Sequence, residues 1–160
     1  MSAQEKNPPA SRAVCKSLPV TIRRARPDEL KTCAALYERV GNQTFAWRPK
    51  NWFKAADFID FANSEEIYVA ESHGAILGIL SFFRPSNFVH SLYIDESAQG
   101  FGIGTALIEA ATKFADGPLA LKVDEPNARA RKFYEKLGFI DAHETGIDAG
   151  IRWIRLKQPA

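Results

Sequence analysis

Cysteine is scarce in this sequence of 160 residues, which contains only Cys15 and Cys33. Two cysteines cannot build the disulfide framework that stabilises small secreted domains. Neither lies in a CxxC pair or near paired histidines, so the sequence predicts no structural zinc site and no other metal. We therefore expect both side chains to be free thiols in a reducing, cytoplasmic compartment.

Long apolar runs and an excess of one charge are also missing. The most apolar stretch, residues 75–83, has the length of a strand, whereas a membrane-spanning helix needs about 20 residues. Residues 1–13 contain no apolar core of a secretory signal. Lys and Arg total 21 against 19 Asp and Glu, and no run of five like charges occurs. We expect neither a membrane nor a nucleic acid as a partner.

The composition that remains is typical of one globular domain. Hydrophobic residues make up 46% of the chain and charged residues 25%. Residues 1–18 contain Pro, Ser and Lys without periodicity, and we expect an unordered tail there. Residues 19–160 are then predicted to form a single domain.

Hydrophobic periodicity predicts alternating strands and helices in that domain. The expected elements are a strand over 21–24, a helix from Pro27 to a stop at Gly41, a shorter helix within 45–61, strands over 66–72, 75–84 and 88–95, a helix from about 103 to 115, a strand over 119–123, a helix over 127–137, and strands over 139–145 and 151–156. This order, β-α-α-β-β-β-α-β-α-β-β, predicts a mixed α/β fold in which helices flank one sheet.

A glycine-dense loop, Gln99 to Gly104, stands between a predicted strand and a predicted helix. Glycines without a Cβ let backbone amides approach an anion closely, and the helix N-terminus favours phosphate oxygens. The loop predicts a phosphate or pyrophosphate site; a tight turn that only packs the helix on the strand is an equal alternative. A Walker lysine is missing, and Thr105 stands where GxGxxG needs its last glycine, which disfavours a nucleotide-binding domain.

The helix predicted over 127–137 carries a second candidate functional motif. Asn127 and Tyr134 are seven residues apart, two helical turns, so they share one face. The helix would present an amide and a phenol together. Alternatively, Asn127 is an N-cap and Tyr134 a half-buried core aromatic.

Together these two motifs resemble those of the GNAT superfamily of acyl-CoA-dependent N-acetyltransferases. The similar segments are Gln99-x-x-Gly102-x-Gly104 and Asn127-x-x-Ala130-x-x-Phe133-Tyr134-x-x-x-Gly138-Phe139, and the resemblance extends from about residue 20 to 156. It implies a mostly antiparallel, twisted sheet of about seven strands with about four helices. It also implies acetyl-CoA as the cofactor, with CoA as the product.

The resemblance further implies roles for individual residues. The backbone of the strand over 88–95 would bind pantetheine and polarise the thioester carbonyl, the amides of the glycine loop would hold the pyrophosphate, and Asn127 would contact the pantetheine arm. Tyr134, a phenol that stays protonated at pH 7, would be the general acid for the departing thiolate. The implied cofactor residues are Leu92, Tyr93, Ile94, Gln99, Gly100, Phe101, Gly102, Ile103, Gly104, Thr105, Asn127 and Tyr134.

The amine also needs a group that accepts its proton, and His90 is our candidate. Imidazole can act as a base near neutral pH, and some family members that acetylate arylalkyl amines place a histidine at the matching position. A strand histidine satisfied by hydrogen bonds is an equal alternative. Lys122 lies where some protein-acetylating relatives carry a glutamate base, and Glu66, Asp95 and Glu144 remain alternatives acting through water.

The acceptor pocket of the family is built from the segment between the first two helices, the turn before residue 88 and the last two strands. That implies the pocket residues Phe45, Trp47, Trp52, Phe83, Arg84, Asn87 and Trp153, although for any one aromatic a place in the core is favoured. We therefore expect an enzyme that transfers acetyl from acetyl-CoA to a primary amine of a small molecule or peptide, in a ternary complex. The alternative is a non-catalytic acyl-CoA-binding regulatory module. A homodimer is compatible with the exposed strand edge at the carboxyl end.

Overall fold

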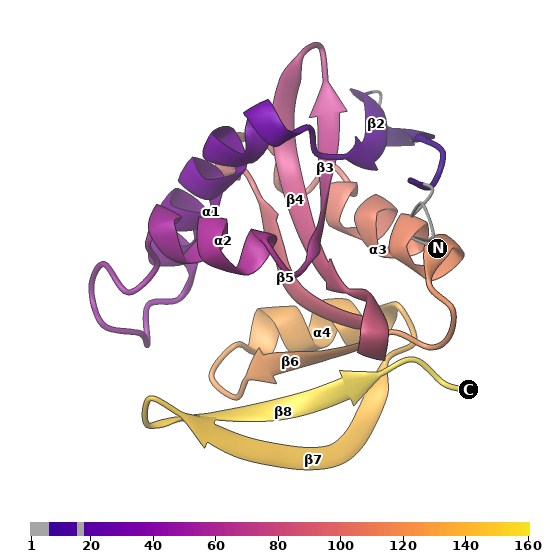
Figure 1. The fold of residues 1–160 in the computed structure, drawn as a ribbon. Coiled ribbons are helices and arrows are strands. Elements are labelled where there is room, and N and C mark those ends of the chain that lie inside the picture. The colour runs from indigo at the N-terminus through magenta and orange to yellow at the C-terminus, as the bar shows by residue number, and fades with distance from the viewer. Residues whose placement is uncertain (1–6, 16–17) are drawn as a thin grey trace, which may run out of the picture.

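The chain folds around one sheet that carries helices on both faces (Figure 1). A computed structural model describes residues 7–15 and 18–160, and eight strands and four α-helices lie within them. The strands are β1 (Ser11–Cys15), β2 (Leu18–Arg24), β3 (Glu66–Ser72), β4 (Ala75–Phe83), β5 (Phe88–Ile94), β6 (Ala120–Asp124), β7 (Ile140–Asp148) and β8 (Ile151–Lys157). The helices are α1 (Leu30–Thr44), α2 (Ala55–Ala62), α3 (Ile103–Phe114) and α4 (Ala128–Lys136), with single 3₁₀ turns η1 (Pro27–Glu29), η2 (Arg84–Ser86) and η3 (Glu96–Ala98).

The sheet is antiparallel except at one junction. Its strand order is β1-β2-β3-β4-β5-β6-β8-β7. β5 and β6 are parallel and, within the described residues, pair at only two positions, Phe88 with Ala120 and Val89 with Leu121. The prediction of a mostly antiparallel sheet with four helices is confirmed, with one strand more than expected.

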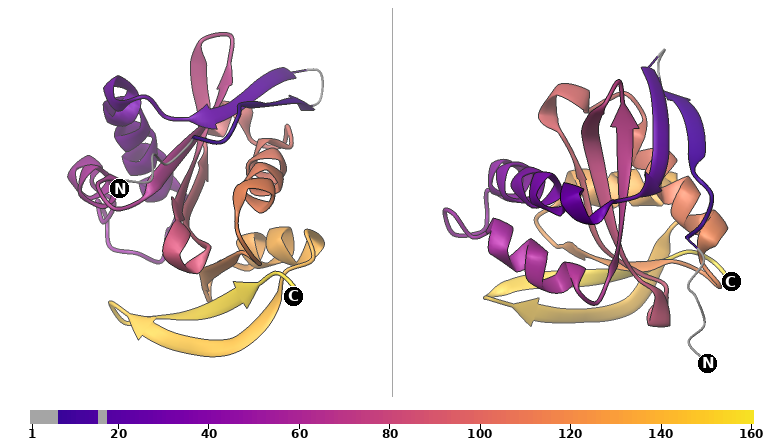
Figure 2. Two further views of the ribbon diagram at one scale, coloured as in Figure 1. Left: turned by 45° about the vertical axis from the view of Figure 1, so that its right-hand side comes forward. Right: turned by 45° about the horizontal axis from the view of Figure 1, so that its top comes forward.

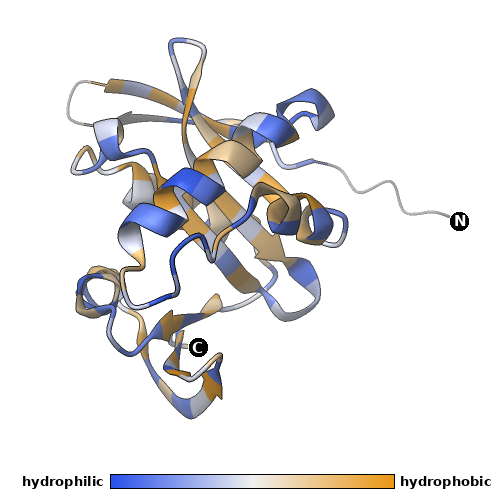
Figure 3. Cartoon of the chain, turned by 90° about the vertical axis from the view of Figure 1, so that its left-hand side faces the viewer, coloured by the Kyte–Doolittle hydropathy of each residue, from blue (hydrophilic) through white to orange (hydrophobic). Residues whose placement is uncertain are grey.

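The helices form two layers, one on each face of the sheet (Figure 2). Successive side chains of β3 point to opposite faces of the sheet, as in any β-strand, so alternate residues pack against different helix layers. Ile67 and Val69 pack with α1 and α2, whereas Tyr68 and Ala70 belong to the larger core under α3 and α4. Figure 3 views the α1–α2 side, where the helices carry hydrophilic turns in front of hydrophobic strand segments. None of the helices in the described parts of the chain combines the length and the apolar composition needed to cross a membrane.

The hairpin of β3 and β4 follows the local signals of the sequence. The strand predicted over 66–72 coincides with β3, and the turn falls at His73 and Gly74. Both turn residues have a left-handed φ, 49° and 79°, which matches the geometry of a two-residue hairpin turn.

Strand β1 corrects the expectation of an unordered tail over residues 1–18. It pairs antiparallel with β2, from Ser11 opposite Ile22 to Cys15 opposite Leu18. The rest of the expected tail, residues 1–6 and 16–17, lies outside the described residues. Backbone hydrogen bonds to β2 hold this edge strand, and its sequence SRAVC has no alternating apolar pattern that could have predicted it. The single domain over residues 19–160 stays a prediction.

The expected stop of the first helix at Gly41 is also wrong, because α1 continues to Thr44. Gly41 is needed for packing. A Cβ built there would lie 2.5 Å from Cγ of Phe53, so the Phe53 ring rests directly on the helix backbone. Gly41 is therefore required by the tertiary contact with Phe53 and does not mark the end of the helix. A sequence rule that places glycine just after a helix cannot distinguish these two cases.

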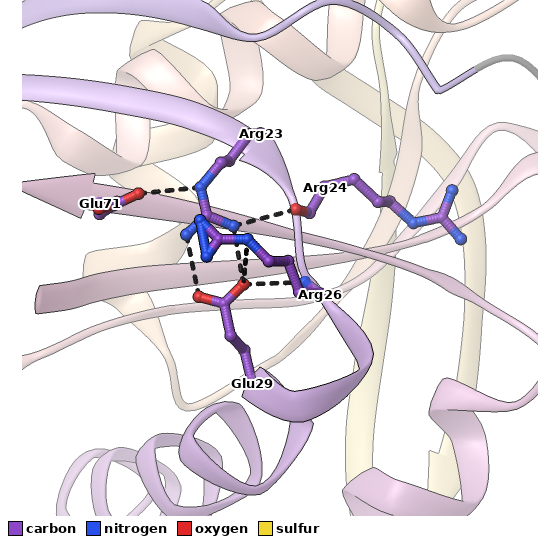
Figure 4. A network of polar contacts seen from close by, with 5 residues as sticks. All are labelled: Arg23, Arg24, Arg26, Glu29 and Glu71. Carbon is purple, nitrogen blue, oxygen red and sulfur yellow. Dashed lines mark hydrogen bonds and ion pairs between the residues drawn. The ribbon is translucent and has the colours of Figure 1, made fainter. Parts of the chain in front are cut away.

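An ion-pair network fixes the entry of the chain into α1 (Figure 4). Arg23 of β2 contacts Glu29 of η1 at 2.8 Å and Glu71 of β3 at 2.8 Å. The backbone N–H of Arg26 also donates to Glu29, at 2.9 Å. The hydrogen bonds from Arg23 lower the pKa of Glu29 to about 2. The network therefore ties β2, β3 and the start of the first helix together.

Candidate active site

A cavity of about 720 Å³ opens where β5 and β6 part. Its walls come from residues 88–93 of β5, residues 121–124 of β6 and the first turns of α4. The segment between α1 and α2 and the tip of the β7–β8 hairpin complete it. Because pairing between β5 and β6 ends at Val89 and Leu121, five segments that are distant in the sequence can meet around one open space.

The cavity collects both predicted catalytic residues and part of the predicted cofactor and acceptor sets. The predicted residues that line it are Phe45, Trp52, His90, Leu92, Tyr93, Asn127, Tyr134 and Trp153. The predicted residues outside its lining are Trp47, Phe83, Arg84, Asn87, Ile94, Gln99, Gly100, Phe101, Gly102, Ile103, Gly104 and Thr105.

The glycine loop lies between η3 and the start of α3, next to the end of β5. Gly102 is the N-cap of α3 with φ +86°, and Gly100 has φ +82°. A Cβ built at either glycine would have no atom within 4 Å, so the space above this backbone is open. Gln99 donates from Nε2 to the carbonyl oxygen of Ile94 at 3.1 Å, which holds the loop against the end of β5. Open glycine amides at a helix N-terminus fit an anionic phosphate group.

The third glycine of the loop has a different task. A Cβ at Gly104 would lie 3.2 Å from the Phe133 ring, so this glycine allows α3 to approach α4 closely. The loop therefore combines both readings of the sequence, an open backbone at two glycines and close helix packing at the third.

Asn127 and Tyr134 reach the cavity from α4, as their spacing predicted. Asn127 caps the helix, with Oδ1 accepting a hydrogen bond from the N–H of Ala130 at 3.1 Å, which leaves the side-chain NH₂ group as its donor toward a ligand. Tyr134 is 8% exposed, and its ring packs edge-on against Phe133 and Phe139. Burial raises the pKa of the Tyr134 phenol above the ordinary value of 10.0, so it stays protonated at neutral pH.

His90 lies on β5 at the edge of the cavity and is half exposed. Its Nδ1 is 3.1 Å from Oε2 of Glu65, and the Phe61 ring packs edge-on against the imidazole at 4.8 Å between centroids. A smaller cavity of about 360 Å³, lined in part by Glu65 and Phe83, adjoins His90 as well. The histidine thus stands between two open spaces.

The three alternative bases do not line the main cavity. Glu66 is buried and accepts hydrogen bonds from Arg84 at 2.6 and 2.9 Å. Burial raises the pKa of Glu66, but the hydrogen bonds from Arg84 and Tyr68 and the charges of Arg84 and Arg24 together more than offset it, so the pKa lies below its ordinary value. Asp95 caps η3 and pairs with Arg39, and Glu144 is exposed on β7. His90 is the one of these four candidates that borders the cavity.

Sequence reasoning missed a charged pair in the cavity wall. Arg48 contacts Asp124 through Nη2 at 2.9 Å and through Nε at 3.2 Å, and its side chain is 8% exposed. Trp47 donates from Nε1 to the same carboxylate at 2.9 Å. The pair joins the segment after α1 to the end of β6, and its members are 76 residues apart. Only the position of Arg48 next to Trp47 in the predicted acceptor segment hinted at it.

Other predicted acceptor residues have structural partners outside the cavity. Arg84 also donates to the carbonyl oxygen of Phe114 at 3.1 Å, and Asn87 accepts a hydrogen bond from the N–H of Asp116. Phe83 lines the smaller cavity. These contacts place Arg84 and Asn87 in the framework that joins β4, β5 and α3.

Trp153 does line the main cavity, and its position depends on a glycine. A Cβ at Gly146 would lie 2.3 Å from the indole, so the ring lies against the β7 backbone. Nζ of Lys122 stands 4.0 Å from the centre of the ring. An aromatic surface with a cation on it therefore forms part of the cavity wall.

Comparison with known proteins agrees with this fold. The chain matches the model described as the acetyltransferase (GNAT) family over residues 31–139. It is 34% identical over 90 residues to the 5-NmdU N-acetyltransferase of Pseudomonas phage PaMx11, over 52% of this chain and 63% of that protein, so the chain spans less than two thirds of that relative. It is 28% identical over 132 residues to the peptidyl-lysine N-acetyltransferase YjaB of Salmonella typhimurium, over 81% of this chain and 89% of that protein.

A solved structure shows the same fold. The PaiA N-acetyltransferase of Thermoplasma acidophilum, in complex with coenzyme A, superposes with a TM-score of 0.70 at 15% identity, covering 88% of this chain and 99% of that one. The chain belongs to the acetyltransferase (GNAT) family, as its two motifs predicted. Its named relatives are N-acetyltransferases, which supports acetyl transfer to an amine, and a non-catalytic module is not favoured.

Proposed function

We propose that this chain transfers the acetyl group of acetyl-CoA to a primary amine by direct attack within a ternary complex. The observation that carries the proposal is the cavity at the end of the β5–β6 pairing, which Tyr134 and His90 both border. The glycine loop at the start of α3 is held against the end of β5, the strand whose residues 88–93 line the cavity. One open space can therefore hold an acyl donor and an acceptor together.

The donor would lie along β5 and over the glycine loop. The backbone of Leu92, Tyr93 and Ile94 would bind the pantetheine arm, and amides of residues 100–105 would hold the pyrophosphate. The open space above Gly100 and Gly102 supports this assignment. When bound, acetyl-CoA supplies an activated acyl thioester. Backbone N–H groups that face the developing negative charge of the carbonyl oxygen would lower the barrier by a few kcal/mol each, on the order of the effect of one removed donor in other enzymes.

Proton transfers are assigned to two side chains. His90 would take a proton from the incoming ammonium group, so that the free amine can form the C–N bond. As the C–S bond breaks, Tyr134 would donate its proton to the departing thiolate, and the second proton of the acylated nitrogen would return to the phenolate through solvent, so that the products are a neutral amide and a thiol. Because burial raises its pKa, the Tyr134 phenol is protonated at neutral pH, so its O–H is available as a donor when the thiolate leaves.

The acceptor would enter beside the segment that follows α1 and the β7–β8 hairpin. The aromatic side chains of Phe45, Trp52 and Trp153 at that end support an acceptor with an apolar or aromatic part. We propose a primary amine of a small molecule or of a peptide. The homodimer and the cytoplasmic location expected from the sequence stay predictions.

A panel of amines tests the activity. The purified chain with acetyl-CoA is offered free amino acids, polyamines, arylalkyl amines and a lysine peptide, and released CoA thiol is measured. We expect saturable release with at least one class, with the acetylated amine identified by mass spectrometry. Release no faster than hydrolysis with every class, from a chain that still binds CoA, would instead favour the non-catalytic acyl-CoA-binding module.

A further inference from the structure

Glu65 is a carboxylate placed to act on the candidate base. It lies in the short connection between α2 and β3, and its side chain is only 9% exposed. A charged group removed from water to this extent needs a partner. The hydrogen-bond partner that the structure gives it is Nδ1 of His90, at 3.1 Å.

The imidazole is held from two sides. Phe61, near the end of α2, packs edge-on against the ring of His90, and Glu65 follows Phe61 by four residues. The end of α2 thus supplies the apolar contact, and the connection that follows it supplies the carboxylate. Together they define the plane of the ring and the direction of its Nδ1.

A carboxylate beside Nδ1 also decides which nitrogen carries the proton. Ionised Glu65 can only accept a hydrogen bond, so in neutral His90 the proton sits on Nδ1 and the lone pair is on Nε2. When Nε2 takes a proton, the imidazolium that forms stands next to a negative charge that stabilises it. The same contact therefore orients the base and supports its protonated form.

We infer that Glu65 is a positioning residue for His90, which holds the imidazole with its Nε2 lone pair free to accept the proton of the amine substrate. The inference rests on the proposed function, because it assigns a partner to the proposed base. The other charged groups that line the two cavities bordered by His90 are Lys122 of β6 in both, Arg155 of β8 in the smaller one, and Arg48, Asp124 and Asp148 in the larger one. These groups stay in place in every variant used below.

A double-mutant cycle separates positioning from a general effect on the fold. Glu65→Ala should lower kcat by about 10-fold or more and leave the KM for acetyl-CoA unchanged, as loss of an orienting partner does elsewhere. His90→Ala should lower kcat at least as much and abolish the acidic limb of the pH–rate profile. In the His90→Ala background, Glu65→Ala should cause no further loss, because its effect passes through the imidazole. Additive losses, or a Glu65→Ala enzyme with the kcat of the wild type, would overturn the inference.

Two further variants guard against a fold defect. Glu65→Gln keeps an oxygen acceptor of the same shape and should retain more kcat than Glu65→Ala. Glu71→Ala is the matched control, since it removes a half-buried carboxylate whose partner, Arg23, lies away from the cavity. It should keep the kcat of the wild type. Equal losses in Glu71→Ala and Glu65→Ala would assign the effect to stability.

A spectroscopic measurement decides the inference without any turnover. ¹⁵N NMR of the imidazole should show the Nδ1–H tautomer of His90 in the wild type and a shift toward the Nε2–H tautomer in Glu65→Ala. Identical tautomer populations in the two proteins would contradict the inference. If no amine is acetylated, the proposed function fails while this measurement still tests the Glu65–His90 contact.

Discussion

At the scale of single residues, Tyr134 shows how one position satisfies packing and chemistry together. Its ring is fixed by Phe133 and Phe139, and its helix is capped by Asn127. The sequence left two readings open for this helix, an N-cap with a core aromatic or a ligand-facing amide and phenol. The structure contains the N-cap and the buried ring, and both residues also line the cavity, so the two readings are compatible.

Replacing Tyr134 tests the acid role directly. Tyr134→Phe keeps the packed ring and removes only the hydroxyl, so we expect kcat to fall about 100-fold or more, within the range of general acid catalysis. The KM for acetyl-CoA should stay unchanged, because the hydroxyl acts on the leaving group. Steady-state kinetics with the best amine of the panel measures both. A variant with undiminished kcat would remove Tyr134 from the mechanism.

The sequence alone did not predict contacts between residues that are distant in the chain. The contacts of Arg48 with Asp124 and of Glu65 with His90 join positions 76 and 25 residues apart. Each partner alone reads as an ordinary polar residue. Periodicity and motif spacing describe neighbours along one helix or strand, so such pairs appear only once the sheet brings them together.

At the scale of elements, prediction succeeded where the signal was local. The β3–β4 hairpin and α4 both carry their turn and cap residues within a few positions. Prediction from the sequence failed where the bounds of an element depend on contacts with residues elsewhere in the chain. β1 forms through backbone pairing with β2, and α1 extends through Gly41 because Phe53 packs on that glycine.

The ion-pair network at the start of α1 predicts that part of the stability of the protein depends on pH. Because the folded pKa of Glu29 is about 2 against an ordinary 4.5, its contribution to stability is complete above pH 4.5 and is lost as the pH falls toward 2. Glu29→Gln should therefore lower Tm by a few degrees at pH 7, a modest effect because the pair is partly solvated. The difference from the wild type should shrink between pH 4.5 and 2.5. Thermal unfolding followed by circular dichroism gives both curves.

Asp28→Asn is the control for Glu29→Gln. It removes an acid of the same first turn whose side chain is exposed, and it should change Tm little at any pH. A Glu29→Gln difference that stays constant down to pH 2.5 would show that the carboxylate is not the group responsible.

At the scale of the whole molecule, the end of one strand pairing creates the site. The parallel contact of β5 and β6 stops after two residue pairs, and the cavity fills the space beyond it. Of the two sequence motifs, the one on α4 contributes Asn127 and Tyr134 to the cavity lining, and the one at the start of α3 packs against α4 through Gly104. The resemblance predicted the family and the fold, whereas the acceptor side depends on how the segment after α1 meets the β7–β8 hairpin, which no single motif encodes.

Calorimetric titration with CoA tests the central claim, that backbone amides around Gly102 hold the pyrophosphate of the donor. Gly102→Ala places a methyl group in open space and forces alanine into a left-handed φ, at a cost of about 1–2 kcal/mol. Gly74→Ala imposes the same cost in the β3–β4 turn, where the space is equally open and lies away from the cavity. We predict saturable CoA binding by the wild type and by Gly74→Ala, and at least about 10-fold weaker binding by Gly102→Ala. No saturable heat from the wild type at millimolar CoA, or equal affinity in all three proteins, would contradict the account.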